Sequence, residues 1–168
     1  MKSALAVFAA LMCCAMPATA AAAPDFDFFD IALCGKGLPF DSEASATALE
    51  DAFRKLERDK DQRYMRVYHL PSPISRDGYT TQSVGVDMGD NGAFMIGVLL
   101  DGKIAGELAK RYDLAPSSKN PKAYVRQIPW PQEIMGVRGV NTLLASDDAG
   151  FKAGQTFLGC MYGVDDFK

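Results

Sequence analysis

The side chains that could carry out catalysis are few, and the histidine count limits them most. His69 is the only histidine among 168 residues, which excludes mechanisms that need two imidazoles and metal sites built from several histidines. It stands at the end of an expected strand, two residues before Pro71. A histidine acts as a general acid or base only with a carboxylate or a nucleophile within hydrogen-bond reach, and the sequence alone places neither. We therefore expect a structural or exposed histidine.

Other chemical motifs are incomplete. Ser83 lacks the first glycine of a G-x-S-x-G nucleophile elbow, because Thr81 occupies that position. Asp87 opens a stretch similar to a calcium-binding loop, but Gly89 and Val98 stand where two of the ligands should be. A hairpin turn explains the same residues better. The sequence therefore predicts no catalytic residue, no metal site and no cofactor.

Acidic residues near expected turns keep a carboxylate-based hydrolase open as the third choice. The candidate carboxylates are Asp87, Asp90, Asp147 and Asp148. Such an enzyme needs two carboxyl groups that face each other across a cleft at a defined separation. Spacing along the chain does not reveal such a pair, and acids beside glycines are typical of turns. An enzyme is therefore the less favoured interpretation.

Residues suited to protein contact gather in one segment. The stretch 71–81 is long for a connection between strands, and two prolines stiffen it. Within it, Ile74, Arg76 and Tyr79 supply contact types found at protein interfaces. Trp130, the only tryptophan, is fixed between two prolines. It is either an anchor for a partner or a plug at one end of the core. These four residues are the predicted binding surface.

The N-terminus has the layout of a secretory signal peptide. Lys2 precedes an apolar stretch from Ala4 to Met16, and small residues follow. The sequence predicts a leader over residues 1–23, cleaved after Ala20 or Ala23. No later stretch approaches the ~20 apolar residues that a transmembrane helix requires. We therefore expect an exported mature chain, periplasmic or secreted, without a membrane contact.

Removing that leader leaves two of the four cysteines. In an oxidising compartment, Cys34 and Cys160 most simply form one disulfide between the two ends of the domain, with two free thiols or an intermolecular bridge as the alternatives. One bridge is too few for a fold held together by cystines. At 48% hydrophobic and 23% charged residues, the chain is typical of a globular protein, and its length predicts a single domain over 24–168.

Two segments have helical periodicity. In the segment 41–58, apolar residues at positions 49, 52, 53 and 56 have the i, i+3, i+4, i+7 spacing of one buried stripe. The segment 103–114 fits a second helix, with a hairpin through Asp101-Gly102 as the alternative.

Alternating or continuous apolar runs predict the strands. The first covers 26–33, ending near Cys34, and a second covers 64–70, stopping at Pro71. The others are 83–88 and 94–100, joined as a hairpin by turn residues 89–92, and 124–128, 140–145 and 155–162. The order β-α-β-β-β-α-β-β-β predicts an α+β domain, with a mostly antiparallel sheet and two helices packed on one face.

These features predict a binding protein. The formal charge of -3 removes the usual reason to expect nucleic acid or an anionic membrane as a partner. The leading hypothesis is an exported, non-enzymatic protein that occludes another protein, in the manner of a periplasmic inhibitor or a toxin-immunity protein. Segment 71–81 would enter the cleft of its partner, an exported toxin or hydrolase. The alternative is a binder of a small ligand or cell-wall fragment, with the site between helix and sheet, in an apolar pocket with a few convergent polar groups.

Overall fold

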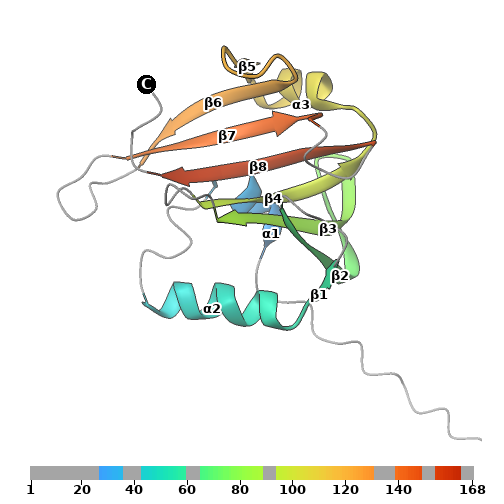
Figure 1. Cartoon of the computed structure of the whole chain (residues 1–168), viewed down its shortest axis with the longest axis vertical. Helices are drawn as coiled ribbons and strands as arrows, with labels where there is room; N and C mark the ends of the chain where they lie inside the picture. The colour runs from blue at the N-terminus through green and yellow to red at the C-terminus, as the bar shows by residue number, and fades with distance from the viewer. Residues whose placement is uncertain are drawn as a thin grey trace, which may run out of the picture.

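A single antiparallel sheet organises the chain. The computed structural model describes residues 27–35, 43–59, 65–88, 94–130, 139–148 and 154–163. Within these ranges, eight strands pair in the order β1-β2-β3-β4-β8-β7-β6-β5, with three helices (Figure 1). The strands are β1 (Glu57–Asp59), β2 (Arg66–Arg76), β3 (Tyr79–Met88), β4 (Phe94–Asp101), β5 (Ala115–Pro116), β6 (Ala123–Pro129), β7 (Val140–Ser146) and β8 (Gln155–Gly163). The helices are α1 (Phe28–Ala32), α2 (Glu43–Arg54) and α3 (Ala105–Tyr112). The predicted α+β class is confirmed.

Some predictions fall where the structure gives no description. The predicted leader and both of its cleavage positions lie outside the described residues, as does the expected turn at 89–92. On either side of that turn, β3 and β4 pair antiparallel as predicted, from Met88 opposite Phe94 to Ser83 opposite Leu99. Nowhere in the described ranges is a helix both long and apolar enough to cross a membrane.

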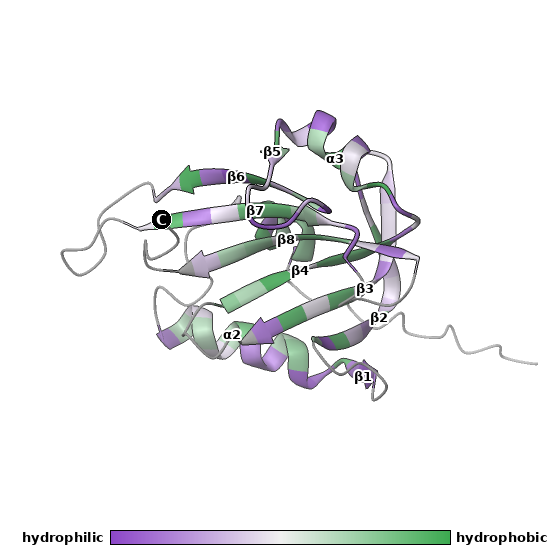
Figure 2. Ribbon diagram, turned by 45° about the horizontal axis from the view of Figure 1, so that its top comes forward, coloured by the Kyte–Doolittle hydropathy of each residue, from purple (hydrophilic) through white to green (hydrophobic). Residues whose placement is uncertain are grey.

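The last strand lies in the middle of the sheet. β8 pairs with β4 on one side and with β7 on the other, and its residues from Thr156 to Cys160 are all buried. A strand that is covered on both faces is a nearly continuous apolar run. Figure 2 shows this contrast, with hydrophobic colour along β4 and β8 and hydrophilic colour in the edge strand β1. The two halves of the sheet therefore meet only through the C-terminal strand.

All three helices contribute to one core. Even-numbered residues of the central strands, among them Ile96, Val98 and Leu158, face this core, together with Leu49 from α2 and Leu108 from α3. The predicted packing of these two helices on one face of the sheet is confirmed. The short helix α1 joins them against β4 and β8, where Figure 1 places it near the middle of the sheet.

The segment predicted as the first strand, 26–33, is instead helical. Asp27 caps α1, because its side chain accepts hydrogen bonds from the backbone N–H groups of Phe29 (3.0 Å) and Asp30 (3.2 Å). A carboxylate at this position satisfies N–H groups that have no partner within the helix. A short apolar run does not distinguish a buried helix from a buried strand by its periodicity. The aspartate before the run is the signal that decides between them.

β2 continues beyond its predicted end at Pro71. β1 pairs with β2 only at Val67–His69, and the register between β2 and β3 shifts between His69 and Ile74. Prolines are tolerated where a strand lies at the edge of the sheet or where its pairing register shifts, because no neighbouring strand there needs the N–H group that proline lacks. The prediction was wrong because it treated a proline as the end of a strand.

The predicted loop 71–81 is therefore a β-hairpin. Arg76 lies opposite Tyr79, and only Asp77 and Gly78 connect the two strands. Both turn residues have positive φ, 54° and 88°, as a two-residue hairpin turn requires. The glycine tolerates this conformation without strain, and aspartate is one of the few other residues that adopt it.

The segment 103–114 contains helix α3, as preferred over the hairpin alternative. Two side chains, one from β8 and one from the residue after β7, accept hydrogen bonds from backbone N–H groups at the start of this helix. The backbone N–H of Ile104 donates to Thr156 Oγ1 at 2.9 Å, and that of Ala105 donates to Asp147 Oδ1 at 3.2 Å. The helix ends at Asp113, which has a left-handed φ of 55°. These long-range caps explain why the segment is helical although it has no side-chain cap of its own.

Cys34 and Cys160 form the predicted disulfide. Their Cα atoms lie 5.2 Å apart, and 126 residues separate them along the chain. Close by, the buried Tyr162 hydroxyl donates a hydrogen bond to the carbonyl of Ile31 at 2.8 Å. Both contacts hold α1 against the central strand β8.

The other face of the sheet carries a second, smaller cluster. Met65, Val67, Leu99 and Phe157 are buried together there. Three glycines, Gly85, Gly97 and Gly159, lie directly opposite one another on β3, β4 and β8. The Phe157 ring is fully buried, and a Cβ added at Gly97 or Gly159 would come within 2.5 Å of it. The absence of side chains along this row allows the ring to lie on the sheet itself.

Candidate functional site

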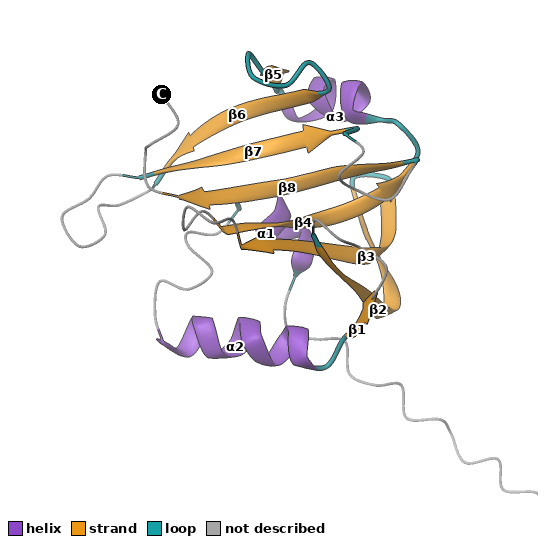
Figure 3. Ribbon diagram, in the orientation of Figure 1, coloured by secondary structure: helices purple, strands orange, loops and turns teal. Residues whose placement is uncertain are grey.

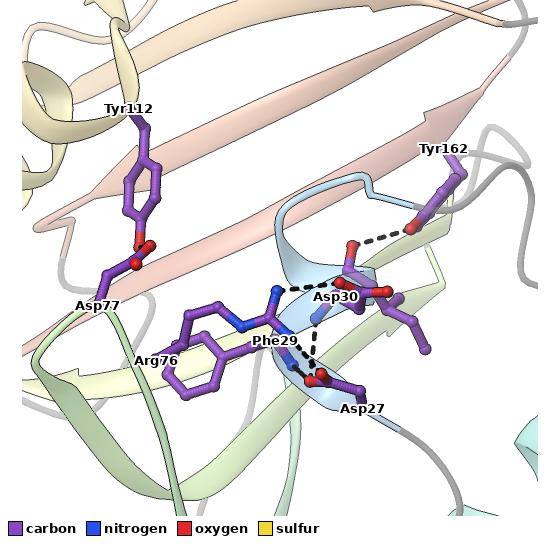
Figure 4. Close-up of polar contacts among 8 residues, drawn as sticks. Asp27, Phe29, Asp30, Arg76, Asp77, Tyr112 and Tyr162 are labelled. Carbon is purple, nitrogen blue, oxygen red and sulfur yellow. Dashed lines mark hydrogen bonds and ion pairs between the residues drawn. The ribbon is translucent and has the colours of Figure 1, made fainter.

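The hairpin residues chosen as contact candidates are engaged within the molecule. Ile74 packs, partly buried, against the main core. The Arg76 guanidinium donates a hydrogen bond to Asp30 Oδ1 at 2.9 Å and forms an ion pair with Asp27 (Figure 4). The hydrogen bond to Asp30 is the main cause that raises the pKa of Arg76 above its ordinary value. The Tyr79 hydroxyl donates to Glu107 at 2.8 Å.

The turn of the hairpin is also tied to α3. The Tyr112 hydroxyl donates to Asp77 Oδ2 at 3.1 Å, and the Arg111 guanidinium lies 3.6 Å from Asp77 Oδ1. Figure 4 shows Tyr112 pointing down onto the turn, next to the Arg76 pairs with α1. The hairpin is therefore clamped between two helices, and two of the side chains that make the clamp, Arg76 and Tyr79, are among those predicted to meet a partner.

This clamp predicts a loss of stability at high pH. Burial, followed by the hydrogen bond to Asp77, raises the pKa of Tyr112 from 10.0 to about 12. Above pH 10 the unfolded chain loses this proton while the folded protein keeps it, so stability present below pH 10 falls as the pH rises towards 12. In urea titrations, Tyr112→Phe should reduce the slope of stability against pH across this window. An unchanged slope would contradict the assignment.

Trp130 lies at the opposite end of the sheet from the hairpin turn. Its neighbour Pro129 pairs with Val140, the first residue of β7, and Val140 pairs in turn with Gly163 at the end of β8. The hairpin turn lies at the other end of the sheet, where β2 joins the start of β3. The indole N–H donates to Asn141 Oδ1 at 2.7 Å, and a Cβ added at Gly139 would lie 2.4 Å from the ring. Asn141 is only 3% exposed. The structure brings Ile74, Arg76 and Tyr79 together, but not Trp130, whose contacts favour its role as a plug.

Two of the four candidate carboxylates, Asp147 and Asp148, have structural partners. Asp147 accepts hydrogen bonds from Thr156 and from the first turn of α3. Asp148 accepts one from the Asn120 side chain at 2.9 Å. Asp87 lies near the end of β3, and Asp90 is outside the described residues. Among the residues that the structure describes, no group of three or more His, Cys, Asp or Glu side chains is placed to hold a metal ion.

The sheet register brings a serine and an aspartate to His69, which the sequence could not show. Ser83 Oγ lies 3.3 Å from His69 Nδ1, and Asp59 Oδ2 lies 3.8 Å from Nε2. The aspartate contact is too long for a hydrogen bond. The Ser83 backbone N–H, which could stabilise an oxyanion, donates to Thr81 Oγ1 at 3.0 Å. Within the described part of the chain, the trio therefore shows neither the orienting bond nor the nearby donor that acyl transfer requires.

A cavity lies on the sheet face opposite the helices, and not between helix and sheet, where the sequence placed a small-ligand site. It has a volume of about 590 Å³, within the range of small-molecule sites. β6 and β7 form its floor, β8 contributes Met161, and the segment 117–120 forms a wall. The side chains that alternate with the floor residues, such as Tyr124 and Leu143, face the main core. In Figure 3 the loop that forms this wall connects β5 to β6.

The cavity wall is fixed by its own hydrogen bonds. Ser117 Oγ accepts from the N–H groups of Lys119 (3.2 Å) and Asn120 (3.3 Å). Asn120 Nδ2 in turn donates to the carboxylate of Asp148, two residues after the end of β7. A site held in place before a ligand arrives loses less entropy on binding.

The cavity lining combines apolar and polar groups. Val125, Leu144 and Met161 supply apolar surface, while Gln127 and Thr142 lie beside them on the same strands. No described residue hydrogen-bonds to the side chain of Gln127 or Thr142. Sequence reasoning missed this site because its floor comes from two strands whose register is not readable from spacing, although both strands themselves were predicted. The protein-family models, the curated proteins and the solved structures compared with this chain include no match, so the functional assignment rests on the residues themselves.

Proposed function

We propose that the protein is an exported binding protein that holds a small amphipathic ligand in the cavity beside β6 and β7. One observation carries the proposal: the cavity places the apolar side chains of Val125 and Leu144 beside Gln127 and Thr142. The latter two side chains have no hydrogen-bond partner among the described residues. Small-molecule sites are mostly apolar, with a few polar groups that orient the ligand. The preformed wall at 117–120 supports the same function.

The geometry favours the cavity over the hairpin as the binding surface. Arg76 and Tyr79 already bond to carboxylates of the same chain, and a partner that used them would have to replace those bonds. Trp130 is at the other end of the sheet and bonds to Asn141. Occlusion of a partner protein by the segment 71–81 remains a prediction from the sequence, without a set of free contact side chains to support it.

Export is the second part of the proposal. It is supported by the predicted signal peptide and by the disulfide between Cys34 and Cys160, since such bonds persist in oxidising compartments. We assign the mature protein to the periplasm or the extracellular space.

A screen with a matched pair of variants tests the function. Protein-observed NMR with a library of neutral amphipathic compounds should shift the methyl signals of Met161 and Leu144. For ligands of about twenty non-hydrogen atoms we expect Kd values on the order of 10–100 µM. Val125→Trp fills the cavity and should abolish these shifts. Val140→Trp should preserve them, because Val140 is on the same face of β7 but outside the lining.

Two results would overturn the proposal. One is binding that is unaffected by Val125→Trp, which would place the ligand elsewhere. The other is turnover of an ester probe that disappears in His69→Gln, which would make the trio on β1, β2 and β3 the functional site.

A further inference from the structure

We infer that the cavity selects a straight aliphatic chain with a neutral amide or hydroxyl head group, an inference that rests on the proposed function. The order of residues along the floor carries it. Three pairs face each other across β6 and β7: Gln127 with Thr142, Val125 with Leu144, and Ala123 with Ser146. At 3.3–3.4 Å per residue, the outer pairs lie roughly 13 Å apart. The floor is thus a narrow track with a polar pair at one end and an apolar pair in the middle.

The middle of the track fits an aliphatic chain. Val125, Leu144 and Met161 are all aliphatic, and the Met161 thioether adapts to flexible partners. Flat rings and organic cations are recognised by aromatic side chains, and none is among the described lining residues. Leu144 also packs against the buried cluster around Phe157, which supports the floor from the side.

The polar groups select a neutral head. Gln127 and Thr142 offer an amide and a hydroxyl, which both donate and accept hydrogen bonds, so an amide or alcohol satisfies them without an ionic charge. At the other end, beside the Ala123–Ser146 pair, the cavity is lined by both Lys119 and Asp148, whose opposite charges leave no net charge to attract an anion. The described lining beside Gln127 and Thr142 carries no positive charge, and burying a carboxylate there without a cationic partner is disfavoured. Fatty-acid anions are therefore expected to bind more weakly than the corresponding amides.

A homologous series of probes measures the inference directly. Calorimetric titration of the oxidised mature protein with straight-chain primary amides, from butanamide to octanamide, should give an affinity that rises about fourfold per methylene. Octanoate should bind at least tenfold more weakly than octanamide. Val125→Thr keeps the volume but adds a hydroxyl to the track, and should weaken octanamide binding about tenfold. The matched control Val140→Thr should leave binding within twofold of the wild type.

Each other outcome identifies what has failed. If octanoate binds as tightly as octanamide, the neutral head is wrong. If the trimer of N-acetylglucosamine shifts the Thr142 and Met161 signals while the amides do not, the aliphatic class is overturned and the ligand-binding function stands. If neither probe class binds and the compound library also fails to shift these signals, the inference and the proposed function fall together.

Discussion

Replacing Gly97 or Gly159 by alanine is expected to lower the free energy of unfolding by about 3 kcal/mol or more. At Gly97 the added Cβ would lie 2.6 Å from the Gly159 Cα and 2.5 Å from the Phe157 ring. At Gly159 it would lie 2.8 Å from the Ile96 carbonyl oxygen and 2.2 Å from the same ring. A flexible side chain can move away from a new methyl group, but paired backbone in the middle of a sheet cannot. Both substitutions should therefore force β4 and β8 apart.

A helical glycine gives the matched control. Gly106 lies within α3, and a Cβ added there would have Tyr124 Oη at 3.6 Å as its nearest neighbour. Gly106→Ala should leave stability unchanged or raise it by about 0.5–1 kcal/mol, since alanine is the better helix former. Urea unfolding followed by circular dichroism measures all three variants. If Gly97→Ala and Gly159→Ala also unfold within 1 kcal/mol of the wild type, the ring does not lie on the glycine row.

The removal of Phe157 tests the same packing from the other side. Because the ring fills the space that the glycines leave, Phe157→Leu creates room for a methyl group. The double variant Gly159→Ala with Phe157→Leu should therefore lose less stability than the sum of the two single variants. Additive losses would show that the clash is with the backbone alone.

The elements that the sequence predicted correctly are those whose signal is local. The stripe around Leu49 and Ala52 marks α2, and alternation around Val84 and Val86 marks β3, because the side-chain period of each element reflects the face it buries. The Cys34–Cys160 pairing was predictable because only two cysteines remain after the leader. These features need no knowledge of which strands are neighbours.

The predictions that failed depend on contacts distant in sequence or on a rule applied too strictly. The clamp on the hairpin needs Asp27 and Glu107, which only the fold brings to Arg76 and Tyr79. The cavity needs the register of β6 with β7. By contrast, the hairpin turn at Asp77-Gly78 was readable from its two residues, and it was missed because the prolines of β2 were taken as its end.

Loss of the disulfide is the other change with a large expected effect. The bond closes a segment of 126 residues, for which the chain-entropy model gives a stabilisation of about 5 kcal/mol. Cys34→Ala combined with Cys160→Ala should therefore lower the free energy of unfolding by about 3–5 kcal/mol. That is a large part of the 5–15 kcal/mol typical of a domain. Removing both cysteines avoids a buried free thiol, and urea unfolding measures the difference.

Hydrogen exchange separates this effect from a general loss of stability. The disulfide joins Cys34, two residues after the end of α1, to Cys160 in β8. Beside it, the Tyr162 hydroxyl donates a hydrogen bond to the Ile31 carbonyl in α1. Without the bond, the amides of α1 should exchange earlier than those of α3, whose caps at Asp147 and Thr156 do not involve the cysteines. Wild-type protein reduced with dithiothreitol should behave like the double variant. If both keep the wild-type unfolding midpoint, the core alone holds α1 in place, and the oxidised state no longer supports an exported site of action.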